Sequence, residues 1–137
     1  MPWGVSQENW RWYQDNAPEP TSALAAENVR PTLANNTDKI RLRVTVRSIL
    51  GGGTLSNLYL EWSQDQVNWF AFGASQHWNY ANGQATEGNA TTTYKLSDSN
   101  DHGKYHESAT ISETWAMDGI WKEMDWCIVP TAYVEGG

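Results

Sequence analysis

The sequence predicts an all-β protein built as an antiparallel β-sandwich or jelly roll. Short segments alternate apolar and polar residues, polar loops separate them, and no segment of ten or more residues has the apolar spacing of an amphipathic helix. The composition agrees: of 137 residues, 39% are hydrophobic and only 18% charged, and Ser, Thr, Asn and Gln fill the difference. A chain of this length predicts one domain.

The first expected element is an N-terminal arm over residues 1–16, which combines three tryptophans with polar residues. Trp10 and Trp12 flank Arg11, so both indoles lie on one face of an extended chain. Two prolines then end the segment, because proline cannot donate to a β-ladder. We expect the arm to dock on its own sheet or on a neighbouring copy, followed by a single β-sandwich domain over residues 17–137.

The clearest strand is expected over residues 40–49. Four apolar residues alternate there with four polar ones, so one face is buried and the other is wet. The apolar positions are Ile40, Leu42, Val44 and Val46, and the polar ones are Arg41, Arg43, Thr45 and Arg47. Three glycines at 51–53 then form a flexible connection.

A β-hairpin is expected next. Residues 58–62 and 67–72 both alternate, and a polar turn over residues 63–66 separates them. The alternation places Trp62 and Trp69 on the inward face, so both are predicted core residues.

The second half of the chain is less regular. Short strands are expected over 91–94, 105–114 and 120–129, with a loop over 97–103. The last strand carries Ile120, Met124, Trp126 and Ile128 on one face, and Pro130 ends it. Trp126 is therefore the third predicted core tryptophan.

Charge and hydropathy exclude several partners. The net charge of −7 and the pI of about 4.8 disfavour binding to nucleic-acid phosphate. No run of 18 apolar residues is present, so no membrane span is expected. Residues 1–4 lack the basic and apolar regions of a signal peptide, and the single Cys127 cannot form an intrachain disulfide. We therefore expect a chain that is made in the host cytoplasm and stays there until it is assembled or released.

No residue pattern predicts catalysis, a metal or a cofactor. His102 and His106 have a spacing that holds zinc on a helix, but their segment is expected to run from a loop into a strand. Acidic pairs such as Glu107 and Glu113 have no fixed separation. Neither a Ser-His-Asp arrangement with a nucleophile elbow nor a phosphate-binding loop is found. We expect a protein that is not an enzyme.

The arginines of the 40–49 strand suggest an interface. Arg41, Arg43 and Arg47 share one strand face, whereas residues 96–137 hold most of the excess of negative over positive charge. A basic face on one copy can pair with an acidic face on another and direct self-assembly. The alternative is that Glu61 and neighbouring acids neutralise the arginines within one subunit.

The nine tryptophans divide the functional possibilities. Trp3, Trp10 and Trp12 of the arm are candidate interface residues, because an aromatic arm buries its rings on a neighbour. Trp78 and Tyr80 lie in a Gly- and Asn-rich segment and are candidates for an exposed platform that stacks on sugar rings. They could equally fold back over the end of the sandwich. Trp115 and Trp121 receive no role.

Several segments follow one another in a recognisable order: RWYQD at 11–15, LAAEN at 24–28, KIRLRV at 39–44, LEWSQDQVNW at 60–69 and YHES at 105–108. This order resembles small β-sandwich domains encoded in tailed-phage structural-gene clusters and in large bacterial surface proteins. In those domains an RW-x-N-D opening, a LAAEN segment, an IRLR strand and a YS-x-D-G-x-W hairpin succeed one another. Gln66 stands where that pattern has glycine, which leaves the turn type open. The resemblance implies a virion or surface component and carries no activity.

Together these observations favour a non-enzymatic structural protein of a phage virion. It would decorate or cement the capsid, or form part of the tail, as a homo-oligomer that contacts other virion proteins. The alternative is a carbohydrate-binding or host-adhesion module at a virion or cell surface, with glycans as its partners.

Overall fold

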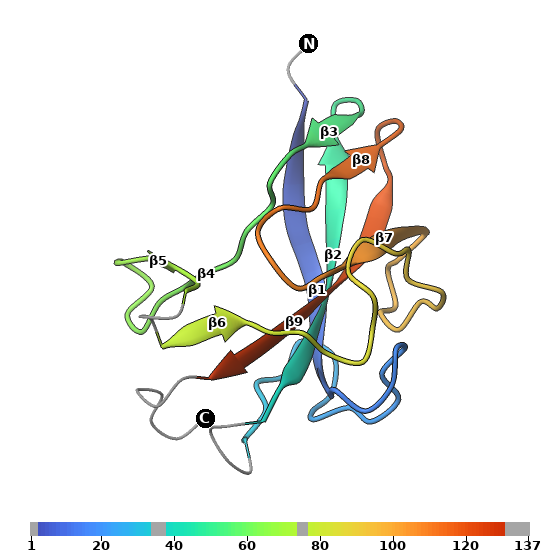
Figure 1. The fold of residues 1–137 in the computed structure, drawn as a ribbon. Helices are drawn as coiled ribbons and strands as arrows, with labels where there is room; N and C mark the ends of the chain where they lie inside the picture. Colours follow the sequence, from blue (N-terminus) through green and yellow to red (C-terminus); the bar gives the residue numbers. More distant parts are fainter. Residues whose placement is uncertain (1–2, 34–37, 74–76, 131–137) are drawn as a thin grey trace.

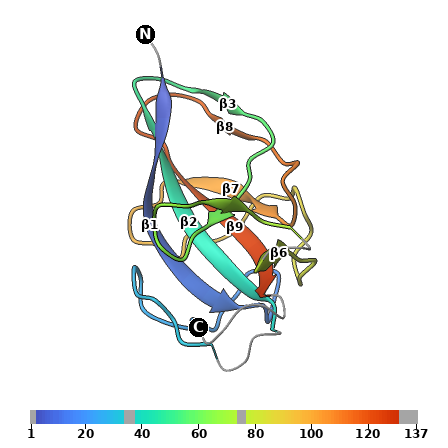
Figure 2. The ribbon, with the colours of Figure 1, turned by 90° about the vertical axis from the view of Figure 1, so that its left-hand side faces the viewer.

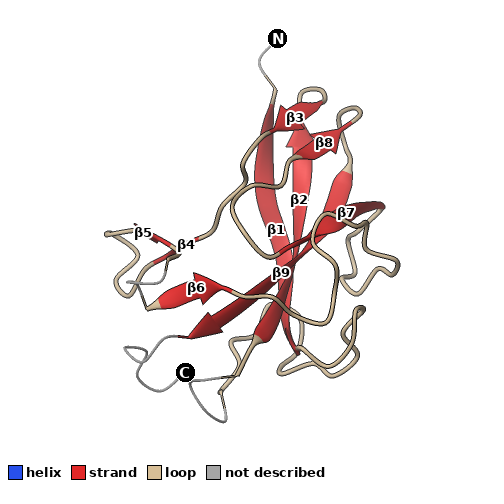
Figure 3. Cartoon of the chain, viewed as in Figure 1, coloured by secondary structure: helices blue, strands red, loops and turns tan. Residues whose placement is uncertain are grey.

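The structure is a computed structural model that describes residues 3–33, 38–73 and 77–130. In these ranges all regular elements are β-strands and there is no helix, which confirms the predicted all-β class. The strands are β1 (Gly4–Gln14), β2 (Ile40–Ile49), β3 (Gly53–Leu55), β4 (Glu61–Trp62), β5 (Phe70–Ala71), β6 (Trp78–Tyr80), β7 (Asp101–His106), β8 (Glu113–Trp115) and β9 (Trp121–Pro130) (Figures 1 and 3).

The main sheet has the order β1-β2-β9-β6, and β7 also pairs with β9. The β7–β9 pairing is parallel, and the other pairings are antiparallel. β7 lies along residues 122–126, whereas β6 lies along residues 128–130. The strands expected at 40–49 and 120–129 are thus confirmed, and they are direct neighbours through eight paired positions.

One face of the main sheet carries the hydrophobic core. Ile40, Val44, Met124, Trp126 and Ile128 are buried there, at most 4% exposed. Apolar side chains from the segments between β3 and β6 pack against them, namely Leu58, Leu60, Phe72, Trp78 and Tyr80. The β3–β8 pair lies to one side of β1 and β2 in Figure 2. This packing of antiparallel sheets is consistent with a β-sandwich.

The opposite face of the main sheet carries buried charges. Arg41 and Arg43 are each 0% exposed. Arg41 Nε lies 2.5 Å from Asp125 Oδ1, and Arg43 Nε lies 2.6 Å from Asp125 Oδ2. Arg43 also pairs with Glu123 at 2.8 Å and with Glu19. The prediction of an exposed arginine stripe is therefore wrong for Arg41 and Arg43, because they are buried, and β9 and the loop after β1 supply their carboxylate partners.

These partners differ from the one expected from the sequence, since Glu61 is exposed on β4. The acids come instead from β9 and from the loop after β1. Arg41 Nη1 reaches Asp15 Oδ1 at 3.0 Å, and its other hydrogen bonds go to backbone carbonyls of residues 17 and 18. Burial alone would lower the pKa of Arg43, but Asp125, Glu19 and Glu123 raise it, so the guanidinium stays charged.

The strand expected at 91–94 is not formed, and the reason lies in the same network. Thr91 N–H donates to a neighbouring strand, at Gly103 O of β7, whereas N–H groups in and just after the rest of the segment are bound by carboxylates. Thr92 N–H donates to Glu19, and the N–H groups of Lys95 and Leu96 donate to Glu123. The strand expected at 105–114 is divided into the end of β7 and β8, and β7 begins inside the predicted loop 97–103.

The expected arm is a full strand of the sheet. Gly4–Gln14 forms β1 and pairs with β2 from Gly4 opposite Ile49 to Gln14 opposite Ile40. Trp3 lies against its own chain, with its ring 6.3 Å from that of Trp115. The described part of the arm therefore docks on its own sheet.

Candidate functional site

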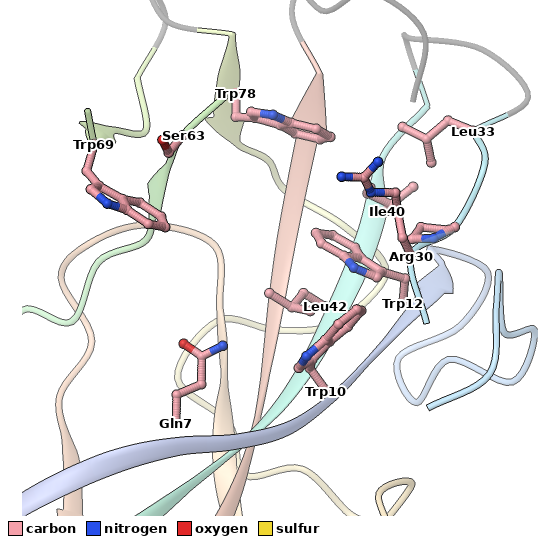
Figure 4. A pocket seen from close by; sticks show the side chains of 11 residues that line it. Gln7, Trp10, Trp12, Arg30, Leu33, Ile40, Leu42, Ser63, Trp69 and Trp78 are labelled. Carbon is pink, nitrogen blue, oxygen red and sulfur yellow. The ribbon is translucent and has the colours of Figure 1, made fainter. Parts of the chain in front are cut away.

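An open pocket of about 500 Å³ lies on the apolar side of the main sheet and is the candidate site. Four of the nine tryptophans line it. Among the described residues, the lining consists of Gln7, Trp10, Trp12, Arg30, Pro31, Leu33, Ile40, Leu42, Ser63, Trp69 and Trp78 (Figure 4). Aromatic and aliphatic side chains thus form most of its surface, and three polar side chains interrupt it.

Strands β1 and β2 form the floor of the pocket. Trp12 lies opposite Leu42, and Trp10 lies opposite Val44, so both indoles share the apolar face with the β2 side chains. A bulge between Gln7 and Trp10 adds one residue to β1. Without it, an odd separation would place Gln7 and Trp10 on opposite faces. The bulge therefore brings the Gln7 amide onto the same face as the indoles.

The β4–β5 hairpin and β6 form one wall. Trp78 of β6 lies with its ring centroid 6.5 Å from that of Trp12, and Trp69 approaches from the hairpin (Figure 4). Asp65 holds the hairpin turn: its Oδ1 accepts the N–H groups of Val67 and Asn68 at 2.9 and 2.8 Å. These hydrogen bonds lower the pKa of the Asp65 carboxyl. The hairpin wall is therefore stabilised by a turn in which the Asp65 carboxylate already accepts several hydrogen bonds.

The prediction that Trp69 is a core residue is wrong. Trp62 is half-buried and pairs directly with Phe70, with ring centroids 4.9 Å apart. Because neighbouring residues of a strand point to opposite faces, Trp69 is turned away from Trp62 and is 55% exposed. A register that differs by one residue from the expected one moves the ring from the core to the pocket. Trp126, in contrast, is 2% exposed, which confirms its predicted core position.

The third side of the pocket comes from Arg30, Pro31 and Leu33. The preceding segment runs along the free edge of β1: Leu24 N–H donates to Trp12 O at 2.9 Å, and Asn28 N–H donates to Trp10 O at 2.7 Å. Asn28 then takes a left-handed conformation, with φ of 62°, which turns the chain. Figure 4 shows the Arg30 guanidinium directed toward the space between Trp12 and Trp78.

The lining favours binding over catalysis. Indole faces stack on flat apolar surfaces, and the Gln7 amide, the Ser63 hydroxyl and the Arg30 guanidinium can hydrogen-bond polar groups of a ligand. Among the described residues that line the pocket there is no Asp, Glu, His, Cys or Lys. The Ser63 hydroxyl is held in the hairpin turn, where it donates to Asp65 Oδ1 at 3.0 Å and accepts the Gln66 N–H at 2.8 Å.

The structure brings together part of the predicted site residues. Trp10 and Trp12, expected at an interface, and Trp78, expected at a sugar platform, all line the same pocket. Tyr80 does not: its hydroxyl accepts the Leu60 N–H at 2.8 Å, and its ring packs 5.4 Å from Phe72. Tyr80 therefore lies outside the described lining of this pocket, and its ring packs in the apolar layer.

The remaining predicted interface residues lie away from the pocket. Trp3 packs near Trp115, which is 1% exposed and donates its indole N–H to Val46 O at 2.9 Å. Arg47 lies over the Trp121 ring, 4.9 Å from its centroid, and pairs with Glu8 at 3.3 Å. Trp115 is thus a core residue, and Trp121 is a half-buried partner of Arg47. The sequence alone assigns no role to either tryptophan.

Arg30, Trp69, Gln7 and Ser63 are lining residues that the sequence did not reveal. Arg30 stands next to a proline in a polar stretch, and only the pairing of residues 24–28 with β1 brings it over the floor. Gln7 faces the pocket because of the β1 bulge, which an alternating sequence pattern does not reveal. Trp69 faces the pocket because of the register of the β4–β5 hairpin.

Other titratable groups are engaged inside the fold. His106 Nε2 lies 2.7 Å from Glu113 Oε2, and its ring stacks 4.2 Å from Trp126. His102 stacks on Tyr94 at 4.1 Å. Burial, with nearby Asp15, raises the pKa of the Cys127 thiol to about 12, so it is not a thiolate at neutral pH.

In residues 3–33, 38–73 and 77–130, no three His, Cys, Asp or Glu side chains are arranged to hold a metal ion. The same residues contain no helix long and apolar enough to cross a membrane.

Comparison of this chain with protein-family models, curated proteins and solved structures finds no match. The fold and the chemistry of the pocket are therefore the guides to function.

Proposed function

We propose that this protein is a carbohydrate-binding module that holds a saccharide in the four-tryptophan pocket. The observation that carries the proposal is the gathering of Trp10, Trp12, Trp69 and Trp78 around one open hollow. Pyranose rings present flat C–H faces that pack on indoles, and their hydroxyl groups need hydrogen-bonding partners at the edges. Gln7, Ser63 and Arg30 can provide these partners.

The exposure of the rings supports a ligand and not a core. Trp69 is 55% exposed, and Trp10, Trp12 and Trp78 are all half-buried. Open, mostly apolar concavities with a few polar groups are the usual form of small-molecule sites. Trp10, Trp12 and Trp78 pack on the buried core with one side and line the open pocket with the other.

Binding of neutral and acidic oligosaccharides is measured by quenching of tryptophan fluorescence and by calorimetry. Trp78→Ala and Trp69→Ala should each weaken binding about tenfold or more, because truncating an aromatic anchor costs about 2 kcal/mol. Val67→Ala is the matched control: it lies on the same hairpin, is 76% exposed and does not line the pocket. An array of glycans that gives no binding, or Trp78→Ala that binds as well as wild type, would refute the proposal.

A second function, a self-assembling structural component of a phage virion, is favoured by one observation. Four large apolar side chains of the 59–70 region are exposed by 45% or more, and these are Tyr59, Val67, Trp69 and Phe70. Contiguous exposed apolar surface commonly marks a protein contact. Light scattering tests this: an oligomer that Tyr59→Ser with Val67→Ser converts to a monomer supports it, and a wild-type monomer contradicts it.

A further inference from the structure

We infer that the pocket takes an acidic saccharide, a chain containing uronic acid, whose carboxylate pairs with Arg30. This inference rests on the proposed carbohydrate-binding function and names its ligand class. It comes from the charge of the lining, the state of Arg30 and the arrangement of the rings around it.

The lining has the opposite charge to the protein as a whole. The chain carries 16 acidic and 9 basic residues, for a net charge of −7. The described residues that line the pocket include one cation, Arg30, and no carboxylate. Acidic side chains are abundant in the chain, and several occupy the other face of the sheet, where they surround Arg41 and Arg43. The pocket is thus a site where a ligand carboxylate meets a cation and no adjacent acid.

Arg30 is available for such a ligand. The ion pairs among the described residues use Arg41, Arg43, Arg47, His106 and Lys122 as their cationic members, so Arg30 forms none of them. The guanidinium is exposed and points into the pocket (Figure 4). Its planar fork matches a carboxylate with two parallel hydrogen bonds, a geometry that a lysine does not reproduce.

The tryptophans define where the sugar rings lie. Trp12 and Trp78 stand beside Arg30, whereas Trp69 lies at the hairpin side and Trp10 farther along β1 (Figure 4). A sugar ring that packs on the pocket side of the Trp12–Trp78 pair, whose ring centroids lie 6.5 Å apart, places a substituent carboxylate next to the guanidinium. Neighbouring rings of the same chain then extend toward Trp10 and Trp69, and each ring of a uronic-acid chain carries a carboxylate that can pair with Arg30.

The experiment uses the full chain and a matched pair of ligands, hexagalacturonate and its methyl ester, which differ only in the charge of the carboxyl groups. Wild type should bind the acid about tenfold more tightly than the ester. Arg30→Gln should bind the acid and the ester with equal affinity, and Arg30→Lys should retain part of the preference for the acid. Lys39→Gln removes the same charge outside the pocket lining and should keep the preference.

The outcomes separate the two proposals. Equal wild-type affinity for acid and ester, or an acid preference that survives in Arg30→Gln, overturns the inference while saccharide binding stands. Failure of the acid, the ester and the neutral glycan array to quench fluorescence refutes the carbohydrate function itself. Equal loss of acid preference in Lys39→Gln and Arg30→Gln also overturns the inference, because the effect would then be one of net charge.

Discussion

The two faces of the main sheet use polar and aromatic residues in opposite ways. On one face, Arg41 and Arg43 are enclosed with Asp125 and Glu123, and the four side chains are at most 1% exposed. On the other face, beyond the apolar core, indoles surround a hollow of about 500 Å³ that contains one cation and no carboxylate in its described lining. The charged face has its partners within the chain, whereas the aromatic face lacks them.

The contrast between the charged face and the aromatic face indicates which face is available to bind a partner. A stripe of arginines on a strand suggests an intermolecular contact, but here it is an internal cross-brace that ties β2 and β9 to the loop after β1. The tryptophans on the other face remain partly exposed although they lie beside a buried core. A binding partner from outside the chain is therefore expected on the aromatic face and not on the charged face.

The largest expected effect comes from breaking the charged face. Arg43→Met should destabilise the protein by roughly 3–5 kcal/mol, because Asp125 and Glu123 lose a buried counter-charge. Arg47→Met, on the same strand face but partly exposed, should cost at most about 1 kcal/mol. Urea unfolding measures both free energies. Similar values for the two variants would contradict the division of this face into a buried and an exposed part.

A pH titration tests the same face with a smaller effect. Burial alone would raise the pKa of Glu19, but hydrogen bonds from Thr93, Tyr105 and the Thr92 N–H, with nearby Arg43, lower it from 4.5 to about 2. A lowered folded-state pKa means that the stabilisation is present above pH 4.5 and is lost as the pH falls toward 2.

Glu19→Gln should therefore be less stable than wild type at pH 7, by about 2 kcal/mol, since hydrogen bonds to a charged acceptor are lost. It should also lose less stability than wild type between pH 4.5 and 2. The exposed Glu61→Gln should keep the wild-type slope. Parallel acid-unfolding curves for wild type and Glu19→Gln would exclude this role.

The smallest effect concerns the wall of the aromatic face. Gln66 has φ of 62°, a left-handed conformation that costs a non-glycine residue about 1–2 kcal/mol. Gln66→Gly should raise stability by about 0.5–1 kcal/mol after the entropy of glycine is counted. Gln64→Gly in the same turn should not stabilise. Thermal unfolding decides between them, and a lower Tm for Gln66→Gly would show that the side chain compensates for the strain.

Periodicity identified the elements whose faces differ strongly. The β2 alternation is unambiguous because Ile40 and Val44 meet a core while Arg41 and Arg43 meet acids, and β9 shows the same contrast. The prediction of a strand at 91–94 is wrong, because a β-prone composition does not reveal that the carboxylates of Glu19 and Glu123 accept hydrogen bonds from N–H groups in and just after this segment.

The candidate site was predictable only in part, for related reasons. Trp78 follows from its place in a polar segment, and the sequence also marked Trp10 and Trp12 as functional, though for a neighbouring copy. Trp69 depends on a one-residue register that the turn sets. Arg30 depends on contacts across the edge of β1 between residues well separated in the chain, such as Asn28 and Trp10. Local patterns do not encode such contacts.

The position of β9 has a consequence for how the chain folds. β9 is the common neighbour of β2, β6 and β7, so the sheet is held together by the last described strand. The ion pairs that join it to β2 span 84 and 82 residues of chain. During synthesis, β2 has no β9 beside it, and Arg41 and Arg43 lack Asp125, until residues 121–130 are made. Contacts between residues so far apart in the chain form slowly, and the earlier segments can aggregate until these contacts form. We therefore expect refolding limited by the arrival of β9.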